Sequence, residues 1–195
     1  MRICVVWYFS GMKFARFLEP NSLDLLNLRA KIKAGGCGRC HCLSAVVVHG
    51  YLWGYAASGD DKVTRGMRFL CSDRYSNHGC GGTFSVYWDT VIPRCSLRTA
   101  QLLELMRVIA TGPTTHGAWH SSRLKTPVSS VYRWVAKWRN LTAQIRTRLC
   151  LVVAPPGKTD GQPDPFTLHH LTAAFPQAAC AIAAFQSGLQ TAITG

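Results

Sequence analysis

Apolar residues recur every three or four positions through the middle of the chain, which is the spacing that one face of an α-helix requires. This period predicts a helix over residues 96–111, with an apolar face formed by Leu102, Leu105, Met106 and Ile109. Gly112 and Pro113 end this helix, and residues 115–122 are expected to form a short second one.

The same period returns at Thr126, which we expect to cap a helix that has Pro127 at its first position. The apolar stripe of this helix consists of Val131, Trp134, Val135 and Trp138. Apolar positions continue at the same spacing over residues 141–151, so the helix is expected to extend that far.

Alternating and β-branched residues predict three strands before these helices, over residues 46–55, 63–70 and 83–88. His49-Gly50-Tyr51, Trp53 and Tyr55 lie in the first of them, where they either stack on bases or cover a small core. Residues 22–33 predict a helix capped by Ser22; the alternative is a poorly ordered leader.

Four cysteines bracket the predicted strands. Cys37 and Cys40 are two residues apart, a spacing that lets one tight turn place both thiols on the same side. Cys71 and Cys80 form a second pair, in which residues 74–79 have to loop out. Four thiolates leave no position for water, so we predict a structural, non-catalytic Zn²⁺ bound by Cys37, Cys40, Cys71 and Cys80.

Other ligand sets remain open. His78 is an alternative to Cys71 or Cys80, and His41 or Cys42 is an alternative to Cys40. The remaining cysteines fit buried structural thiols better than metal ligands: Cys4, Cys95, Cys150 and Cys180.

These elements predict an α+β protein. A leader (1–33) with one helix or none precedes a small three-stranded zinc ribbon (34–93) and a helix-turn-helix domain (94–154). A proline- and glycine-rich linker (155–165) leads to an apolar helical tail (166–195), which is a candidate for homo-oligomerisation and is expected to form two helices split near Pro176.

The net charge of +13 is concentrated in one segment, because residues 94–148 contain ten Lys or Arg and a single acidic residue. Such a field attracts phosphate backbones. We expect Ser129, Ser130 and Arg133 to approach base edges. The residues expected to contact phosphate are Arg123, Lys125, Lys137 and Arg139. Arg146 is a further residue expected to bind nucleic acid. The alternative is an ordinary helical bundle with a solvated basic surface.

The sequence shows no convincing secretory signal and no run long enough to span a membrane, so we expect no membrane partner. An intracellular location, in the cytoplasm or nucleoid, fits this pattern, and there paired cysteines hold metal more often than they form disulfides. The nine acidic residues include no visible set of three carried on strands, so we predict no catalysis by metal ions.

Four segments together resemble the N-terminal zinc ribbon of insertion-sequence transposases: Cys37-x-x-Cys40, His49-Gly50-Tyr51, Arg68-Phe-Leu-Cys71 and Cys80-Gly-Gly-Thr-Phe-Ser85. The basic helix-turn-helix that follows is similar to the DNA-binding half of the same proteins, so the resemblance covers residues 37–140. It implies recognition of the inverted repeats that end a mobile element. The longer second cysteine pair and the lack of a visible catalytic domain depart from the family.

We therefore expect a nucleic-acid-binding protein of transposon origin that binds duplex DNA, at element ends, without catalysis of its own. One alternative is a zinc-ribbon protein that binds structured RNA through stacking and phosphate contacts. Two others are an active transposase or nuclease and a degenerate fragment that neither binds metal nor folds cooperatively.

Overall fold

The structure, a computed structural model of the chain, describes residues 15–18, 25–43, 45–55, 61–74, 78–157 and 163–193. The chain divides into two compact units, each described by itself below. The sheet unit comprises Met1–Gly54 and Lys62–Asp89, and the helical unit comprises Tyr55–Asp61 and Thr90–Gly195. The predicted cap Ser22 and most of the leader lie outside the described residues.

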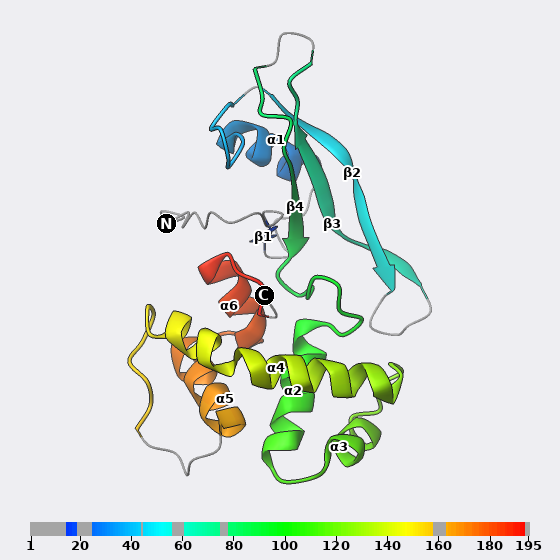
Figure 1. Ribbon diagram of the computed structural model, residues 1–195, viewed down its shortest axis with the longest axis vertical. Helices are drawn as coiled ribbons and strands as arrows, with labels where there is room; N and C mark the ends of the chain where they lie inside the picture. The colour runs from blue at the N-terminus through cyan, green and yellow to red at the C-terminus, as the bar shows by residue number, and fades with distance from the viewer. Residues whose placement is uncertain are drawn as a thin grey trace. The chain divides into compact units, whose positions relative to one another are not determined.

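The three predicted strands are confirmed as β2 (Val46–Tyr55), β3 (Lys62–Cys71) and β4 (Thr83–Trp88). They form the antiparallel part of a sheet with the order β1-β4-β3-β2 (Figure 1). The strand β1 (Ala15–Leu18) was not expected; it pairs in parallel with β4. The leader also contributes α1 (Leu25–Gly35), which confirms its helix and buries Ile32.

The core of the sheet unit lies on one face of β3 and β4. Met67 stands opposite Val86, and Phe69 stands opposite Phe84. All four side chains are buried, and the two phenyl rings stack with centroids 5.5 Å apart. Because cross-strand partners share a face of the sheet, these pairs join the two strands through apolar contact as well as through backbone hydrogen bonds.

The helical unit contains, in the described part of the chain, the five helices α2 (Thr99–Ala110), α3 (Thr115–Ser121), α4 (Val128–Leu149), α5 (Pro163–Ala174) and α6 (Ala181–Leu189). The periodic stretches thus form helices as expected, and the α+β class is confirmed. The helix α4 is the longest of them and runs across the unit from α3 to α5 (Figure 1).

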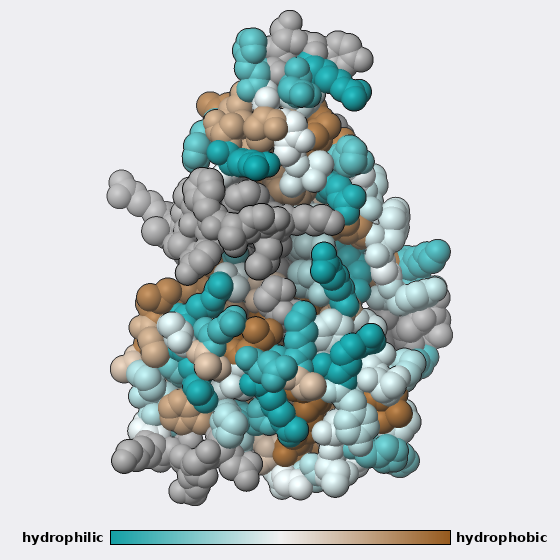
Figure 2. Space-filling model, viewed as in Figure 1, coloured by the Kyte–Doolittle hydropathy of each residue, from teal (hydrophilic) through white to brown (hydrophobic). Residues whose placement is uncertain are grey.

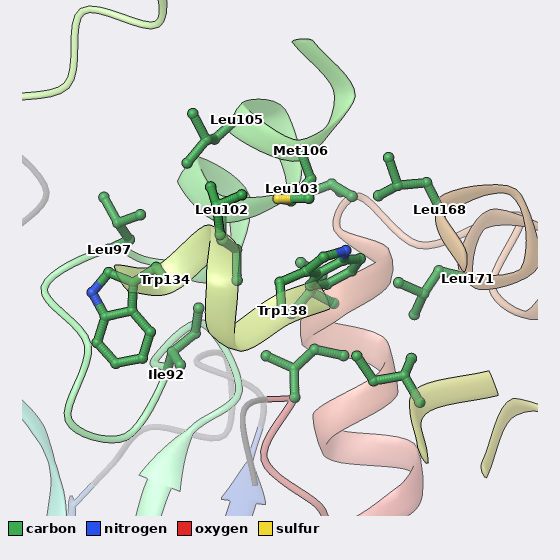
Figure 3. Close-up of a cluster of buried hydrophobic side chains, with 14 of the residues drawn as sticks. Ile92, Leu97, Leu102, Leu103, Leu105, Met106, Trp134, Trp138, Leu168 and Leu171 are labelled. Carbon is green, nitrogen blue, oxygen red and sulfur yellow. The ribbon is translucent and has the colours of Figure 1, made fainter. Parts of the chain in front are cut away.

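One continuous core joins these helices. The side chains of Trp134 and Trp138 enter it from α4, and Leu102 and Met106 enter it from α2 (Figure 3). Leu168 and Leu171 of α5 line the same cluster (Figure 3), as do Ala181, Ile182 and Phe185 of α6. The apolar residues of the predicted tail are therefore used inside the unit, and oligomerisation through them stays a prediction.

Three local predictions are wrong. Thr126 does not cap α4; Pro127 holds the N-cap position, and the carbonyl of Thr126 accepts a hydrogen bond from Nε1 of Trp119 at 2.9 Å. A residue before proline is pushed into extended backbone, which leaves that carbonyl free to turn towards the indole. Cys150 is exposed because it follows the last residue of α4, and Cys180 is only partly buried. Cys95 is buried as expected, and Cys4 lies outside the described residues.

The segment interpreted as a linker ends earlier than expected. The helix α5 begins at Pro163, where a proline is tolerated because the first N–H of a helix has no partner within the helix. Within the described residues, no helix combines the length and the apolar character needed to cross a membrane.

Candidate metal centre

The first cysteine pair lies in a tight turn after α1. The N–H of Cys37 donates to the carbonyl of Cys42 at 3.0 Å, and the N–H of His41 donates to the carbonyl of Cys37 at 2.8 Å. His41 has a φ of 59°, which reverses the chain just after Cys40. The turn therefore places the thiols of Cys37 and Cys40 on one side, as their spacing predicted.

The second pair is formed where β3 ends and β4 approaches. Cys71 is the last residue of β3, and its N–H donates to the carbonyl of Gly82 at 2.9 Å. The N–H of Gly79 donates to the carbonyl of Ser72 at 3.0 Å, which holds these two residues together beside the end of β3. This closure explains how Cys80 reaches Cys71 despite the eight residues between them.

Gly79 is required at this point. A β-carbon there would lie 2.2 Å from the carbonyl oxygen of Ser72 and 2.8 Å from Sγ of Cys71, both closer than atoms of a packed protein approach. Gly79 has no signal in the sequence beyond its place directly before Cys80.

The Sγ atoms of Cys37, Cys40, Cys71 and Cys80 all lie within 4.8 Å of one another. Those of Cys37 and Cys80 are 3.8 Å apart, and those of Cys40 and Cys71 are 3.5 Å apart. A tetrahedral zinc ion with Zn–S bonds of about 2.3 Å separates its sulfur ligands by about 3.8 Å. The four thiols therefore fit a tetrahedral metal ion such as zinc. The alternatives His41, Cys42 and His78 are described by the structure but do not belong to this group.

Backbone amides face the sulfur atoms. The N–H of Arg39 points to Sγ of Cys37 at 3.3 Å, and the N–H of Cys80 points to Sγ of Cys71 at 3.4 Å. Donors in this position stabilise thiolates, the form that binds metal. A backbone hydrogen bond at Cys42 lowers the pKa of the Cys40 thiol to about 7.

Burial acts in the other direction on the second pair, because it raises the pKa of the Cys71 and Cys80 thiols. Without a cation, these two sulfur atoms would stay protonated at neutral pH. A bound divalent ion reverses this preference, since coordination removes the proton from a thiol outright. The donor set is thus suited to a metal ion and unsuited to remaining as four free thiolates.

The residues predicted to bind nucleic acid lie in the helical unit, on α4 and on the turn that precedes it. Arg123 and Lys125 are exposed in the turn between α3 and α4. Ser129 and Arg133 are exposed on the first half of α4, and Ser130, which is partly buried, accepts a hydrogen bond from Nη2 of Arg133 at 3.1 Å. The structure thereby brings the expected base-contacting residues together at one end of α4.

The other residues predicted to bind nucleic acid follow along α4, and each has a neighbour. Nε of Arg139 pairs with Oδ2 of Asp164 at 2.8 Å. The guanidinium of Arg146 lies 5.4 Å from the ring centre of Phe166, and Nζ of Lys137 lies 5.5 Å from that of Trp134. Arg139 is therefore partly neutralised within the protein. Tyr132, which was not among the predicted residues, is 49% exposed between Ser129 and Arg133.

Comparisons with protein-family models, with curated proteins and with solved structures found no match for this chain. A function is therefore inferred from the group of four cysteines and from the basic residues on α4 and the turn before it.

Proposed function

We propose that this chain is a nucleic-acid-binding protein that folds around one structural zinc ion and binds duplex DNA through α4. The zinc ion would be held by Cys37, Cys40, Cys71 and Cys80, as a closed zinc ribbon without a position for water. Closed coordination favours a structural over a catalytic role, so the ion would hold the strands in place while the basic helices make the main contacts.

The exposed face at the start of α4 carries the proposal. The helices α3 and α4 are separated by six residues, and α4 begins with a surface of Ser129, Tyr132 and Arg133. The opposite face is anchored in the core by Val131, Trp134, Val135 and Trp138. A helix-turn-helix uses this arrangement, in which an anchored helix presents its first turns to the major groove.

The charge of the surroundings supports the same assignment. The sequence contains no acidic residue between Glu104 and Asp160, whereas the same stretch carries nine Lys or Arg. Hydrophilic side chains gather over the face of the helical unit that α4 crosses (Figure 2). An acid-free, basic stretch of this length exceeds what solubility requires and favours a polyanionic partner.

The resemblance of residues 37–140 to the DNA-binding region of insertion-sequence transposases extends the proposal. On that basis, the duplex bound would be the end of a mobile element, and the chain would act there without cutting DNA. Exposed polar side chains at the start of α4 could reach base edges, which suits recognition of a defined end better than non-specific coating.

Selection from a random duplex pool, followed by fluorescence anisotropy on the recovered sequence, tests the proposal. Arg133→Ala should weaken binding of the selected duplex by about 5- to 150-fold if the side chain reads a base. Arg107→Ala is the matched control, because it removes one exposed arginine of the same unit that already lies 3.8 Å from Glu104. It should leave the affinity within about two-fold.

The salt dependence gives a second measurement. Each phosphate contact contributes about −0.9 to the slope of log K against log salt concentration. Arg123→Ala or Lys125→Ala should each reduce the slope by about 1. Equal effects of the Arg133 and Arg107 substitutions would refute the role of α4, and structured RNA that outcompetes the duplex at matched salt would replace DNA by RNA as the partner.

A further inference from the structure

The strand β2 carries a row of aromatic side chains that the duplex-binding proposal does not use. His49, Tyr51 and Trp53 occupy alternate positions, so their side chains leave the same face of the strand. All three are exposed, with Tyr51 at 46% and Trp53 at 61%. The rings of Tyr51 and Trp53 are adjacent, with centroids 6.1 Å apart.

These rings are not the cover of a small core, which was the alternative interpretation of the sequence. The buried apolar side chains of β3 and β4 lie on the face that carries Met67 and Phe69. A β-carbon at Gly54 of β2 would meet the side chain of Arg65, which leaves β3 on that same face, so the alternating residues of the row lie on the opposite face. Among the strands that the structure describes, β2 lies at the edge of the sheet, next to β3. Large exposed side chains on an edge strand invite association, and soluble proteins usually avoid them unless a partner uses them.

The charge beside the row indicates which partner fits. Arg68 of the neighbouring strand β3 is exposed and alternates with the buried Met67 and Phe69, so it points away from the core as the row does. The row itself contains rings and an imidazole but no aliphatic side chain. Aromatic faces next to a guanidinium suit flat bases joined by phosphates better than the aliphatic surface of a protein partner.

We propose that the aromatic row His49–Tyr51–Trp53 binds unpaired bases of a single-stranded nucleic acid, with Arg68 at the phosphates. Alternate residues on a strand are about 6.7 Å apart, which lets neighbouring rings meet successive bases of an extended strand. A duplex cannot use this surface, because its bases stack on one another inside the helix. The site is therefore additional to α4 and requires an opened or naturally single-stranded segment.

Anisotropy of a fluorescein-labelled dT20 strand with the full chain tests the site. Trp53→Ala should weaken binding about five-fold or more, and Trp53→Phe, which keeps a ring, should retain most of the affinity. A strand of the same length without bases should bind more weakly than dT20, since it offers phosphates alone. Parallel measurements with rU20 establish whether the strand is DNA or RNA.

Matched controls separate this site from the α4 surface. Leu151→Ala removes a 79% exposed apolar side chain of the helical unit and should leave dT20 binding unchanged. Arg133→Ala should weaken binding of the duplex but not of dT20, so failure of one proposal is distinguishable from failure of the other. Zinc content and hydrogen exchange of β3 show that the Trp53 variants remain folded.

Three results would overturn the proposal. The first is that folded Trp53→Ala binds dT20 as tightly as the native chain does. The second is that the native chain binds the base-free strand as tightly as it binds dT20. The third is a native dimer, seen by sedimentation, that becomes monomeric on Trp53→Ala, since a second copy would then cover the row.

Discussion

Replacement of Cys71 by serine should remove the metal ion and unfold the sheet unit while the helical unit stays folded. Cys71 is fully buried and its thiol lies 3.5 Å from that of Cys40. Loss of groups that merely orient metal ligands already costs about 10- to 100-fold in affinity. Loss of one of four ligands should therefore cost more than about 100-fold.

The consequence for folding follows from the sizes of the two cores. Among the described residues, the sheet unit buries ten apolar side chains, and two of these are Cys37 and Cys71. The core cluster of the helical unit contains 21 buried residues. Structural zinc contributes about 10–16 kcal/mol, which equals or exceeds the 5–15 kcal/mol by which whole domains are stable. The smaller core should not survive without the ion.

Zinc stoichiometry by mass spectrometry, combined with hydrogen exchange, measures both effects. The native chain should contain one zinc ion, and amides of β3 should be protected in it but not in Cys71→Ser. Amides of α4 should be protected in both. Cys42→Ser and Cys150→Ser are the controls, because both residues lie outside the group of four, and each variant should keep its zinc. A zinc-free Cys71→Ser variant with native protection of β3 would refute the argument.

Three further predictions concern both units. Gly79→Ala should lower zinc affinity with little effect on α4, because the new β-carbon would lie 2.8 Å from Sγ of Cys71. Chelator competition measures the zinc affinity, and an unchanged affinity would contradict the prediction. Acidification should release the zinc ion, because zinc binds thiolates and protons compete with it for the same sulfur atoms. A zinc affinity that stays constant from pH 8 to pH 5 would exclude thiolate ligands. Trp138→Ala should destabilise the helical unit by about 3–5 kcal/mol, because the Trp138 side chain is only 1% exposed. Urea denaturation measures the free energy of unfolding, and a loss under about 1 kcal/mol would contradict the packing.

The elements that the sequence predicted well are those set by local periodicity. The stripe that includes Trp134 and Trp138 is long enough to identify α4, and the two-residue spacing of Cys37 and Cys40 defines their turn. The short parallel strand β1 has no such signal, because its partner β4 lies about 70 residues further along the chain. A contact at that separation is set by the assembled sheet and not by the residues of β1.

The N-terminal end of α5 shows the same limit. Pro163-Asp164-Pro165 has the composition of a linker, yet Asp164 is buried and paired with Arg139 of α4. An ion pair between groups 25 residues apart cannot be inferred from composition. The same contact changes the expected role of Arg139, because a guanidinium engaged by an internal carboxylate has less charge to offer a phosphate.

The hydrogen bond from the N–H of Gly79 to the carbonyl of Ser72 has a consequence for how this protein can vary. It fixes both ends of the intervening stretch against the sheet, so residues could be added or removed between them without displacing the sulfur atoms on either side. Related chains with a shorter or longer stretch here should keep the same metal chemistry. The stretch is accordingly a suitable place to insert an epitope or a fluorescent reporter.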